Sequence, residues 1–231
     1  MEFTIYASGS AGNCYELDDG KTRILLECGL SPKKLHGIVA GKLGEYAGVL
    51  VTHEHMDHAR AAAHCVTMGL PVYMTEGTFS ALDVPNLPNL HGIQADEPFP
   101  IRSYDVLPLR AYHDAAEPVC FLIHSRADGE SILFATDTGV LHHPTAGVTI
   151  LALECNHEEE SLDQDEKMPK KTIERIRRTH LSFERLVRYL SCCDLSKTRE
   201  IVLLHLSNRH SRAEAFAQNI TARFGIPARF E

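Results

Sequence analysis

The hexapeptide His53-Glu54-His55-Met56-Asp57-His58 follows directly on the apolar stretch Val49-Leu50-Val51-Thr52. Three imidazoles and an aspartate within six residues are costly to bury unless they bind something. Alternate residues of a loop at a strand end can face one point, so His53 and His55 can share one cation. Asp57 and His58 begin the following helix and can turn toward a second cation. Because imidazole is the commonest metal ligand in proteins, the hexapeptide predicts a site for metal ions beside a buried strand.

Three further candidate ligands occur in the same local context, each directly after an aliphatic run that predicts a strand: His113, Asp137 and His205. In α/β sheets, the ends of strands carry functional loops to one edge. Together with the hexapeptide, these residues complete two coordination spheres of nitrogen and oxygen. Such a donor set suits two divalent ions, with zinc as the first choice and manganese or iron as alternatives, better than soft copper.

Short β-branched runs alternate with turns and amphipathic stretches, which predicts a mixed α/β fold. The expected strands cover 3–7, 23–26, 48–52, 72–74, 105–112, 119–125, 131–135, 149–154 and 201–205. The expected helices cover 58–68, 76–82, 170–178, 183–191 and 212–224, the last opening on a Ser-x-x-Glu capping pattern at Ser211. Without an internal repeat or linker, we expect one domain over residues 1–231.

The composition narrows the classes of partner. With 23 Lys and Arg against 31 Asp and Glu, the formal net charge is −8, which argues against binding of nucleic acid by bulk positive charge. No apolar run reaches the roughly 18 residues of a membrane span, and the first residues lack the features of a signal peptide. The 7 cysteines show no regular spacing. We therefore expect a cytoplasmic protein without a membrane partner; its oligomeric state stays open.

One segment departs from the acidic average. Residues 158–166 are rich in acids, and residues 167–188 are rich in Lys and Arg. If this basic segment lines the entrance of the site, it can hold a polyanion such as DNA, with Arg175 and Arg178 as candidate contacts. If it pairs with the preceding acids, the substrate is small.

The order of the seven ligands resembles that of the metallo-β-lactamase fold superfamily of dinuclear hydrolases. The segments 8–14, 26–31, 136–139, 154–157, 180–182 and 205–207 resemble its YycJ/WalJ branch, which is related to tRNase Z-type phosphodiesterases. The resemblance runs from residue 6 to about residue 211. It implies a four-layer αββα sandwich with the metals at one edge of two sheets. It also implies a metal-dependent phosphodiesterase, and in this branch a DNA exonuclease.

The resemblance further implies roles for single residues. The first ion would be held by His53, His55 and His113, and the second by Asp57, His58 and His205, with Asp137 bridging. A hydroxide bridging the ions would attack phosphorus, which makes Asp57 catalytic as well as a ligand. His180, supported by Glu154, would protonate the leaving group. The turn that includes Ser8, Ser10, Gly12 and Asn13 would present backbone N–H groups to a phosphate.

The chain also departs from the branch. Glu27 stands where an Asp usually braces the metal loop, and Thr179, Phe183 and His210 differ on the substrate side. Two alternative functions therefore stay open. One is a small-molecule phosphodiesterase for cyclic nucleotides or phosphoribosyl cyclic phosphates, which the net charge favours. The other is a metal-bearing regulator without turnover, which the complete ligand set disfavours.

Overall fold

A computed structural model of the chain describes residues 1–39 and 42–230. The chain divides into two compact units. The N-terminal unit consists of Met1–Arg110 and Ala115–Glu130, and the C-terminal unit consists of Ala111–Asp114 and Ser131–Glu231. Each unit combines strands and helices, which confirms the expected α/β class. The expectation of one domain over the whole chain stays a prediction.

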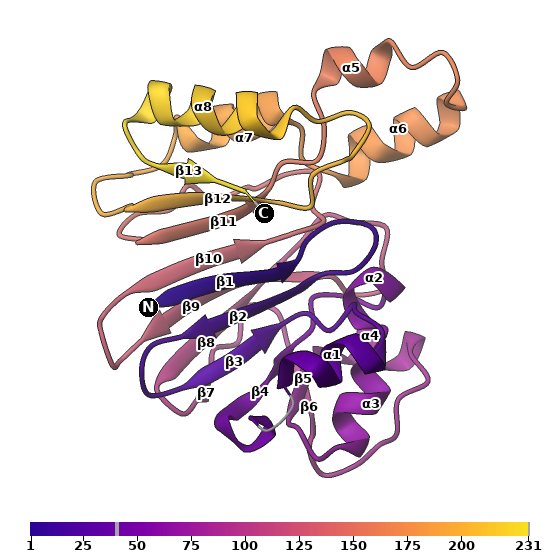
Figure 1. The fold of residues 1–231 in the computed structure, drawn as a ribbon, viewed down its shortest axis with the longest axis vertical. Helices are drawn as coiled ribbons and strands as arrows, with labels where there is room; N and C mark the ends of the chain where they lie inside the picture. Colours follow the sequence, from indigo (N-terminus) through magenta and orange to yellow (C-terminus); the bar gives the residue numbers. More distant parts are fainter. Residues whose placement is uncertain (40–41, 231) are drawn as a thin grey trace. The chain divides into compact units, whose positions relative to one another are not determined.

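A six-stranded sheet in chain order forms the centre of the N-terminal unit (Figure 1): β1 (Glu2–Ala7), β2 (Cys14–Asp18), β3 (Arg23–Leu26), β4 (Tyr46–Leu50), β5 (Val72–Thr75) and β6 (Leu90–Ile93). The first three strands are antiparallel, and β3 to β6 run parallel. Every residue of β4 is buried, as expected for a parallel strand that is covered on both faces. This is the strand that leads into the hexapeptide.

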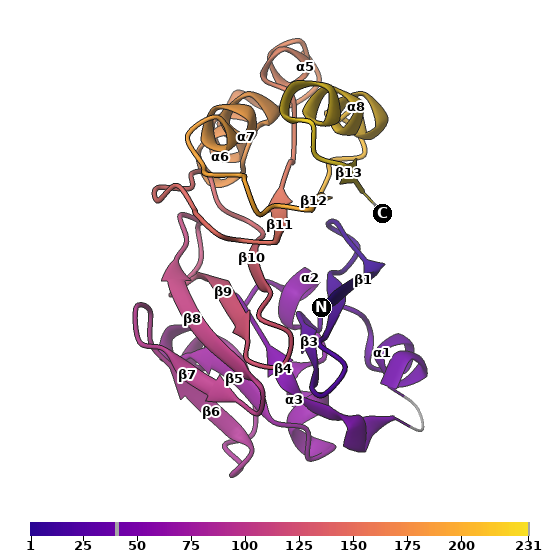
Figure 2. The same cartoon turned by 90° about the vertical axis from the view of Figure 1, so that its left-hand side faces the viewer.

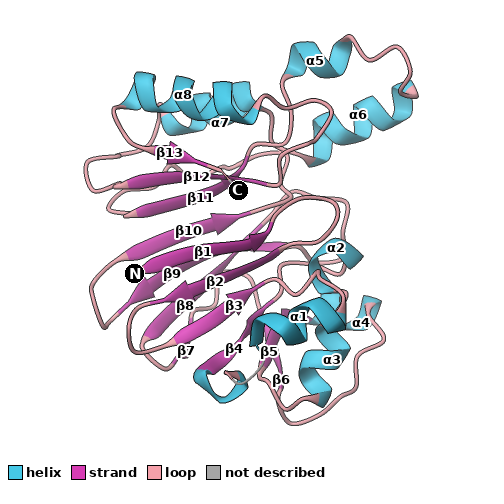
Figure 3. Ribbon diagram, in the orientation of Figure 1, coloured by secondary structure: helices cyan, strands magenta, loops and turns pink. Residues whose placement is uncertain are grey.

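Helices cover one face of this sheet (Figure 3): α1 (Pro32–Val39), α2 (Met56–Ala59), α3 (Ala62–Thr67) and α4 (Glu76–Ala81), with a short 3₁₀ turn at Leu43–Glu45. Leu35 of α1 and Val66 of α3 share a buried apolar core with Val49 of the sheet. The opposite face carries the antiparallel strands β7 (Phe99–Ile101), β8 (Tyr104–Arg110) and β9 (Val119–Ser125) (Figure 2). The Tyr104 hydroxyl donates to the Thr22 carbonyl at 3.1 Å and joins the two layers.

The C-terminal unit contains four parallel strands in the order β10 (Ser131–Ala135), β11 (Ile150–Glu154), β12 (Glu200–Leu204) and β13 (Ala228–Arg229). Its helices are α5 (Glu159–Asp163), α6 (Lys170–Thr179), α7 (Phe183–Leu190) and α8 (Ala213–Phe224). Helices α7 and α8 lie side by side over β11 to β13 (Figures 1 and 2). The rings of Phe183 and Phe216 stack between them with centroids 4.4 Å apart.

All the expected strands are present, with ends within two residues of the predicted ones. The analysis of the sequence missed β2, β6, β7, β13, α1 and α5. The helix expected over 58–68 is interrupted, and α2 and α3 are separate helices. The reason is tertiary: the Ala61 N–H donates to the Cys28 carbonyl at 2.9 Å, where a continuous helix would bond it internally.

The predicted capping box at Ser211 is wrong. Helix α8 begins after Arg212, which makes no side-chain cap. The Ser211 hydroxyl instead donates to the Ser207 carbonyl at 2.7 Å. This hydrogen bond lies in the turn before α8, and the hydroxyl does not cap the helix. Among the described helices, none has both the length and the apolar character needed to cross a bilayer.

Candidate metal centre

The hexapeptide of the N-terminal unit gathers its imidazoles in one place. His53 and His58 are almost fully buried, and the His53 ring lies 4.6 Å from the His55 ring and 4.2 Å from the His58 ring, centroid to centroid. The Thr52 hydroxyl lies 2.9 Å from His53 Nδ1, so Nε2 is the nitrogen of His53 that can coordinate an ion. Hydrogen bonds to the ring nitrogen that does not bind the metal orient histidine ligands in metal sites.

Asp57 and His58 are spaced as two ligands of one ion. Their Oδ2 and Nε2 atoms are 3.6 Å apart. Two ligand atoms on one tetrahedral zinc, each about 2.1 Å from the metal, lie about 3.4 Å from each other. On the other side of the His58 ring, Nδ1 is 3.5 Å from Oε1 of the buried Glu27. Glu27 thus braces the candidate ligand His58. The branch usually has Asp at the position of Glu27.

Neighbouring backbone segments clamp the hexapeptide. The N–H of Asn13 donates to the Asp57 carbonyl at 2.7 Å, and the N–H of Cys28 donates to the His58 carbonyl at 2.8 Å. A Cβ on Gly29 would stand 1.7 Å from the Asp57 carbonyl oxygen, so only glycine allows this approach. Glu27 adopts a φ of 65°, and such backbone strain is typical of functional sites.

The turn expected to bind phosphate is largely bonded within the N-terminal unit. The N–H of Gly9 donates to Asn13 Oδ1 at 2.8 Å, and the N–H of Gly12 donates to the Gly9 carbonyl at 2.9 Å. The buried Asn13 amide also lies 3.1 Å from His58 Nε2. Gly12 and Asn13 therefore contribute to the clamp around the hexapeptide. Phosphate contacts of Ser8 and Ser10 stay predictions.

The candidate residues of the C-terminal unit meet at one edge of its parallel sheet. Asp137 comes two residues after β10, Glu154 ends β11, and His205 follows β12. Since these strands are parallel neighbours, their carboxyl ends carry the three side chains to the same edge. Asp137 and His205 have φ values of 43° and 51°, a left-handed conformation that is uncommon outside glycine.

The two oxygens of Asp137 face different imidazoles. Oδ1 is 3.2 Å from His205 Nδ1, and Oδ2 is 3.5 Å from His113 Nε2. Both distances match the spacing of two ligands on one ion. His113 Nδ1 lies 2.8 Å from the Thr179 carbonyl and must donate to it, which leaves Nε2 as the coordinating nitrogen. Burial lowers the pKa of His113, which favours the neutral form that binds metals.

His180 and Glu154 form a buried pair beside Asp137. Their Nδ1 and Oε1 atoms are 2.7 Å apart, and Glu154 Oε2 accepts the N–H groups of Thr138 at 2.8 Å and Leu181 at 3.0 Å. Burial alone would lower the pKa of His180, but the Glu154 carboxylate outweighs it and the pKa is raised. The same contact keeps the pKa of Glu154 below its usual value although burial opposes this.

The basic segment is partly neutralised. Arg177 pairs with Glu159 at 3.0 Å and also with Asp163, and Arg175 pairs with Asp114 at 2.5 Å. Arg178 is exposed and has no ion pair or hydrogen bond with the described residues. Of the two candidate contacts for substrate, only Arg178 is therefore available without first breaking a pair.

Two residues of the C-terminal unit were not predicted as parts of the site. The Asn156 amide donates to the His205 carbonyl at 3.0 Å and so supports the strained backbone of that ligand. Thr138 fixes Glu154 through its N–H, as described above. Asn156 lies two residues beyond Glu154 at the end of a predicted strand, within the segment 154–157 that resembles the branch, and these were the signals that the sequence offered.

The donor set fits divalent cations. In the C-terminal unit, potential donor atoms of the candidate ligands Asp137 and His205 and of the His180–Glu154 pair all lie within 4.8 Å of one another. The N-terminal unit adds clustered imidazoles and a carboxylate. All these donors are nitrogen or oxygen, which suits zinc, manganese or iron. Buried imidazoles and carboxylates at the ends of parallel strands are typical of metal-dependent enzymes.

The comparison with known families agrees with this class. The model of the beta-lactamase superfamily domain matches residues 22–206, and the chain belongs to this family of metal-dependent hydrolases. It is 26% identical to the exodeoxyribonuclease YycJ of Bacillus anthracis, over 100% of this chain and 94% of that protein. The resemblance to the metallo-β-lactamase fold and its YycJ/WalJ branch is thereby confirmed.

Solved structures share the fold. Zn²⁺-bound PqqB from Methylobacterium extorquens superposes with a TM-score of 0.74 at 17% identity, covering 100% of this chain and 97% of PqqB. The short form of human tRNase Z superposes with a TM-score of 0.64 at 15% identity, covering 100% and 96%. At these identities, the likeness concerns the fold alone.

Proposed function

We propose that the chain is a dinuclear phosphodiester hydrolase that degrades DNA as an exonuclease. The observation that carries the proposal is the placement of Asp137. Its two carboxylate oxygens each adjoin a different histidine, His113 and His205, and the His180–Glu154 pair lies beside it. A carboxylate whose two oxygens could each reach a different ion, with an acid beside it, would suit a two-metal hydrolase.

In this proposal, two ions would be held by the residues that the family resemblance implies. His53, His55 and His113 would hold the first ion and Asp57, His58 and His205 would hold the second, with Asp137 as a ligand of both. When bound, the ions supply Lewis-acid charge for the phosphate and activate water. Zinc is the first choice for imidazole-rich ligands, with manganese and iron as alternatives. The test is metal content per chain, for which we expect two ions.

His180 acts as the general acid. Glu154 keeps Nδ1 of His180 engaged at 2.7 Å, which directs Nε2 away from the carboxylate and toward a leaving group. The raised pKa of His180 favours the protonated ring, which can give its proton to the departing alkoxide. Positioned acids of this kind contribute about 10²- to 10⁴-fold to rate.

DNA as the substrate is supported by the name of the relative from Bacillus anthracis, an exodeoxyribonuclease. The exposed Arg178 on α6 offers one phosphate contact. The seven cysteines are free thiols, which agrees with action in a reducing cytoplasm. The deciding experiment is a panel of end-labelled linear DNA, covalently closed circular DNA, cyclic nucleotides and bis-p-nitrophenyl phosphate. Release of mononucleotides from linear DNA alone among the polymers supports an exonuclease.

A small-molecule phosphodiesterase is the second candidate, and the ion pairs of the basic segment favour it. Arg175 and Arg177 are engaged with acids, and the net charge is −8. On this alternative, cyclic nucleotides or phosphoribosyl cyclic phosphates are cleaved with a higher kcat/KM than any DNA. The same panel separates the two functions.

A further inference from the structure

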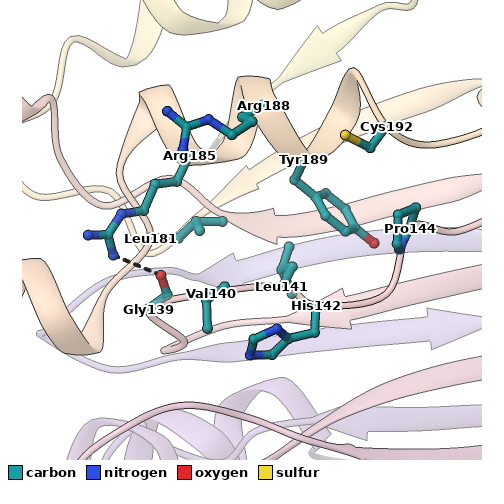
Figure 4. A pocket seen from close by; sticks show the side chains of 10 residues that line it. All are labelled: Gly139, Val140, Leu141, His142, Pro144, Leu181, Arg185, Arg188, Tyr189 and Cys192. Carbon is teal, nitrogen blue, oxygen red and sulfur yellow. Dashed lines mark hydrogen bonds between the residues drawn. The ribbon is translucent and has the colours of Figure 1, made fainter.

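A cavity of about 320 Å³ opens between helix α7 and the loop that follows Asp137. Figure 4 shows Val140, Leu141 and His142 of the loop facing Arg185 and Tyr189 of the helix. The volume lies in the range of cavities that bind small ligands. The cavity is formed entirely within the C-terminal unit.

The lining combines aliphatic side chains with basic ones. Val140, Leu141 and Leu181 supply the aliphatic surface, while Arg185, Arg188 and His142 supply cationic or imidazole groups. Among the described residues that line the cavity, none is acidic, although the whole chain carries a net charge of −8. A cleft lined by both apolar and basic side chains complements a ligand that joins a flat apolar ring to a phosphate.

The two arginines differ in what they can do. Arg185 donates to the carbonyls of Gly139 at 3.0 Å and Arg177 at 2.8 Å, so its planar group is fixed between helix and loop (Figure 4) and can stack against a ring. Arg188 is exposed and has no hydrogen bond or ion pair with the described residues. It is available to a phosphate.

The cavity adjoins the candidate catalytic residues along the chain. Leu181 directly follows His180, and Gly139 is two residues after Asp137, a span that an extended chain covers in about 7 Å. Outside the cavity, the ring of Tyr112 meets the ring of His142 with centroids 4.5 Å apart. The lining of the cavity therefore includes residues that are close in the chain to both Asp137 and His180.

We propose that this cavity binds the nucleoside next to the scissile phosphate, with the base against the apolar side chains of Val140 and Leu141 and the following phosphate on Arg188. The proposal rests on the proposed function, because it assigns a substrate subsite to the same centre. Stacking on aromatic and guanidinium planes accepts every base, so the subsite holds nucleotides without reading sequence.

Cys192 provides a test that needs no turnover. It is an exposed free thiol that lines the cavity, whereas five of the other cysteines are buried. Its alkylation rate is measured with and without deoxynucleoside 5′-monophosphates, with deoxyribose 5-phosphate and inorganic phosphate as controls. The Cys192→Ser variant shows which part of the measured alkylation comes from Cys192. We expect each nucleotide to slow alkylation by the factor 1 + [L]/Kd and the two controls to protect far less. Unchanged alkylation, or equal protection by phosphate, overturns the proposal.

Two variants test whether the nucleotide that protects Cys192 lies in this cavity. Cys192 also lines a second cavity between α7 and α8, but Val140 lines only the first. Val140→Trp should fill the first cavity, abolish the protection and raise the KM for DNA. Leu87→Trp, at a comparably exposed apolar side chain of the N-terminal unit, should change neither. Protection that survives Val140→Trp places the nucleotide elsewhere and refutes the subsite. If DNA is hydrolysed but no nucleotide protects Cys192 from alkylation, the subsite is refuted and the proposed function stands. If nucleotides protect Cys192 but DNA is not hydrolysed, only the nuclease activity is refuted.

Discussion

His180 Nδ1 lies 2.7 Å from Glu154 Oε1, and both side chains are buried. The pair is itself anchored, since Glu154 Oε2 accepts the N–H of Leu181, the neighbour of His180. One carboxylate thus fixes both the ring and the backbone that carries it. This relationship gives His180 one orientation and a raised pKa, the two properties of a general acid.

Replacing His180 should affect poor leaving groups most. We expect His180→Ala to lower kcat on DNA by about 10²- to 10⁴-fold, because an alkoxide must be protonated as it departs. The loss on bis-p-nitrophenyl phosphate should be much smaller, since nitrophenolate departs without a proton. Steady-state kinetics on both substrates check this, with bound metal measured for each protein. Equal losses on both substrates would contradict an acid role.

Glu154→Gln should shift the pH profile. The Glu154 carboxylate raises the pKa of His180, so its loss lowers that pKa and His180 loses its proton at lower pH. The alkaline limb of kcat on DNA should therefore move to lower pH, while Leu181 can still donate to the remaining amide oxygen. An alkaline limb that does not move would show that His180 is not the titrating group.

Asp137→Asn should remove metal and turnover together. Asparagine has the size of aspartate and tolerates the left-handed backbone at φ 43°, so the fold is expected to persist. The amide cannot bridge two cations as a carboxylate does. Metal content after dialysis and hydrolysis of bis-p-nitrophenyl phosphate should both fall, and circular dichroism should not change. Asp83→Asn, at an exposed aspartate, is the matched control and should retain both.

Arg178→Glu should weaken DNA binding in a salt-dependent way. If Arg178 contacts one phosphate, its loss reduces the slope of log K against log salt by about 1. Fluorescence anisotropy with single-stranded DNA over a range of salt concentrations measures this slope. Lys33→Glu, an equal charge change at an exposed lysine of α1, controls for net charge. A wild-type slope in the Arg178 variant would favour the small-substrate alternative.

Periodicity and strand-end reasoning predicted the strands that carry the candidate ligands because β4, β10, β11 and β12 are nearly continuous aliphatic runs. The short strand β13 and helix α5 lack such a pattern, and they form through contacts with distant segments. The same limit applies to the site. His58, Asp137 and His205 could be predicted from their sequence context, whereas the support from Asn156 depends on backbone geometry at φ 51° of His205, which no local pattern encodes.

Gly29→Ala should disrupt the metal loop of the N-terminal unit. The new Cβ would stand 1.7 Å from the Asp57 carbonyl oxygen, and backbone at that point cannot yield without moving the hexapeptide. We expect loss of metal binding and a free energy of unfolding lower by several kcal/mol, on the order of other overpacking changes. Gly37→Ala in α1 meets open space and should stabilise the chain by up to about 1 kcal/mol. Denaturant titrations compare the two, and a Gly29 variant as stable as wild type would contradict the clamp.

His157 should make the fold sensitive to acid. It is fully buried, and neither ring nitrogen has a hydrogen-bond partner among the described residues. Burial lowers its pKa from 6.5 to about 4. The unfolded chain therefore takes up a proton as the pH falls below 6.5, while the folded chain does so only near pH 4. Stability is fully present above the first value and is lost between the two, by up to about 3 kcal/mol.

His157→Met should reduce this loss. The apolar side chain needs no hydrogen bond, so the free energy of unfolding at pH 7 should be unchanged or higher, and its decline toward pH 4.5 should be shallower. Urea titrations at several pH values measure both quantities. His36→Met, at an exposed histidine of α1, should keep the wild-type decline. The same decline in the His157 variant would mean that other buried groups govern the acid response.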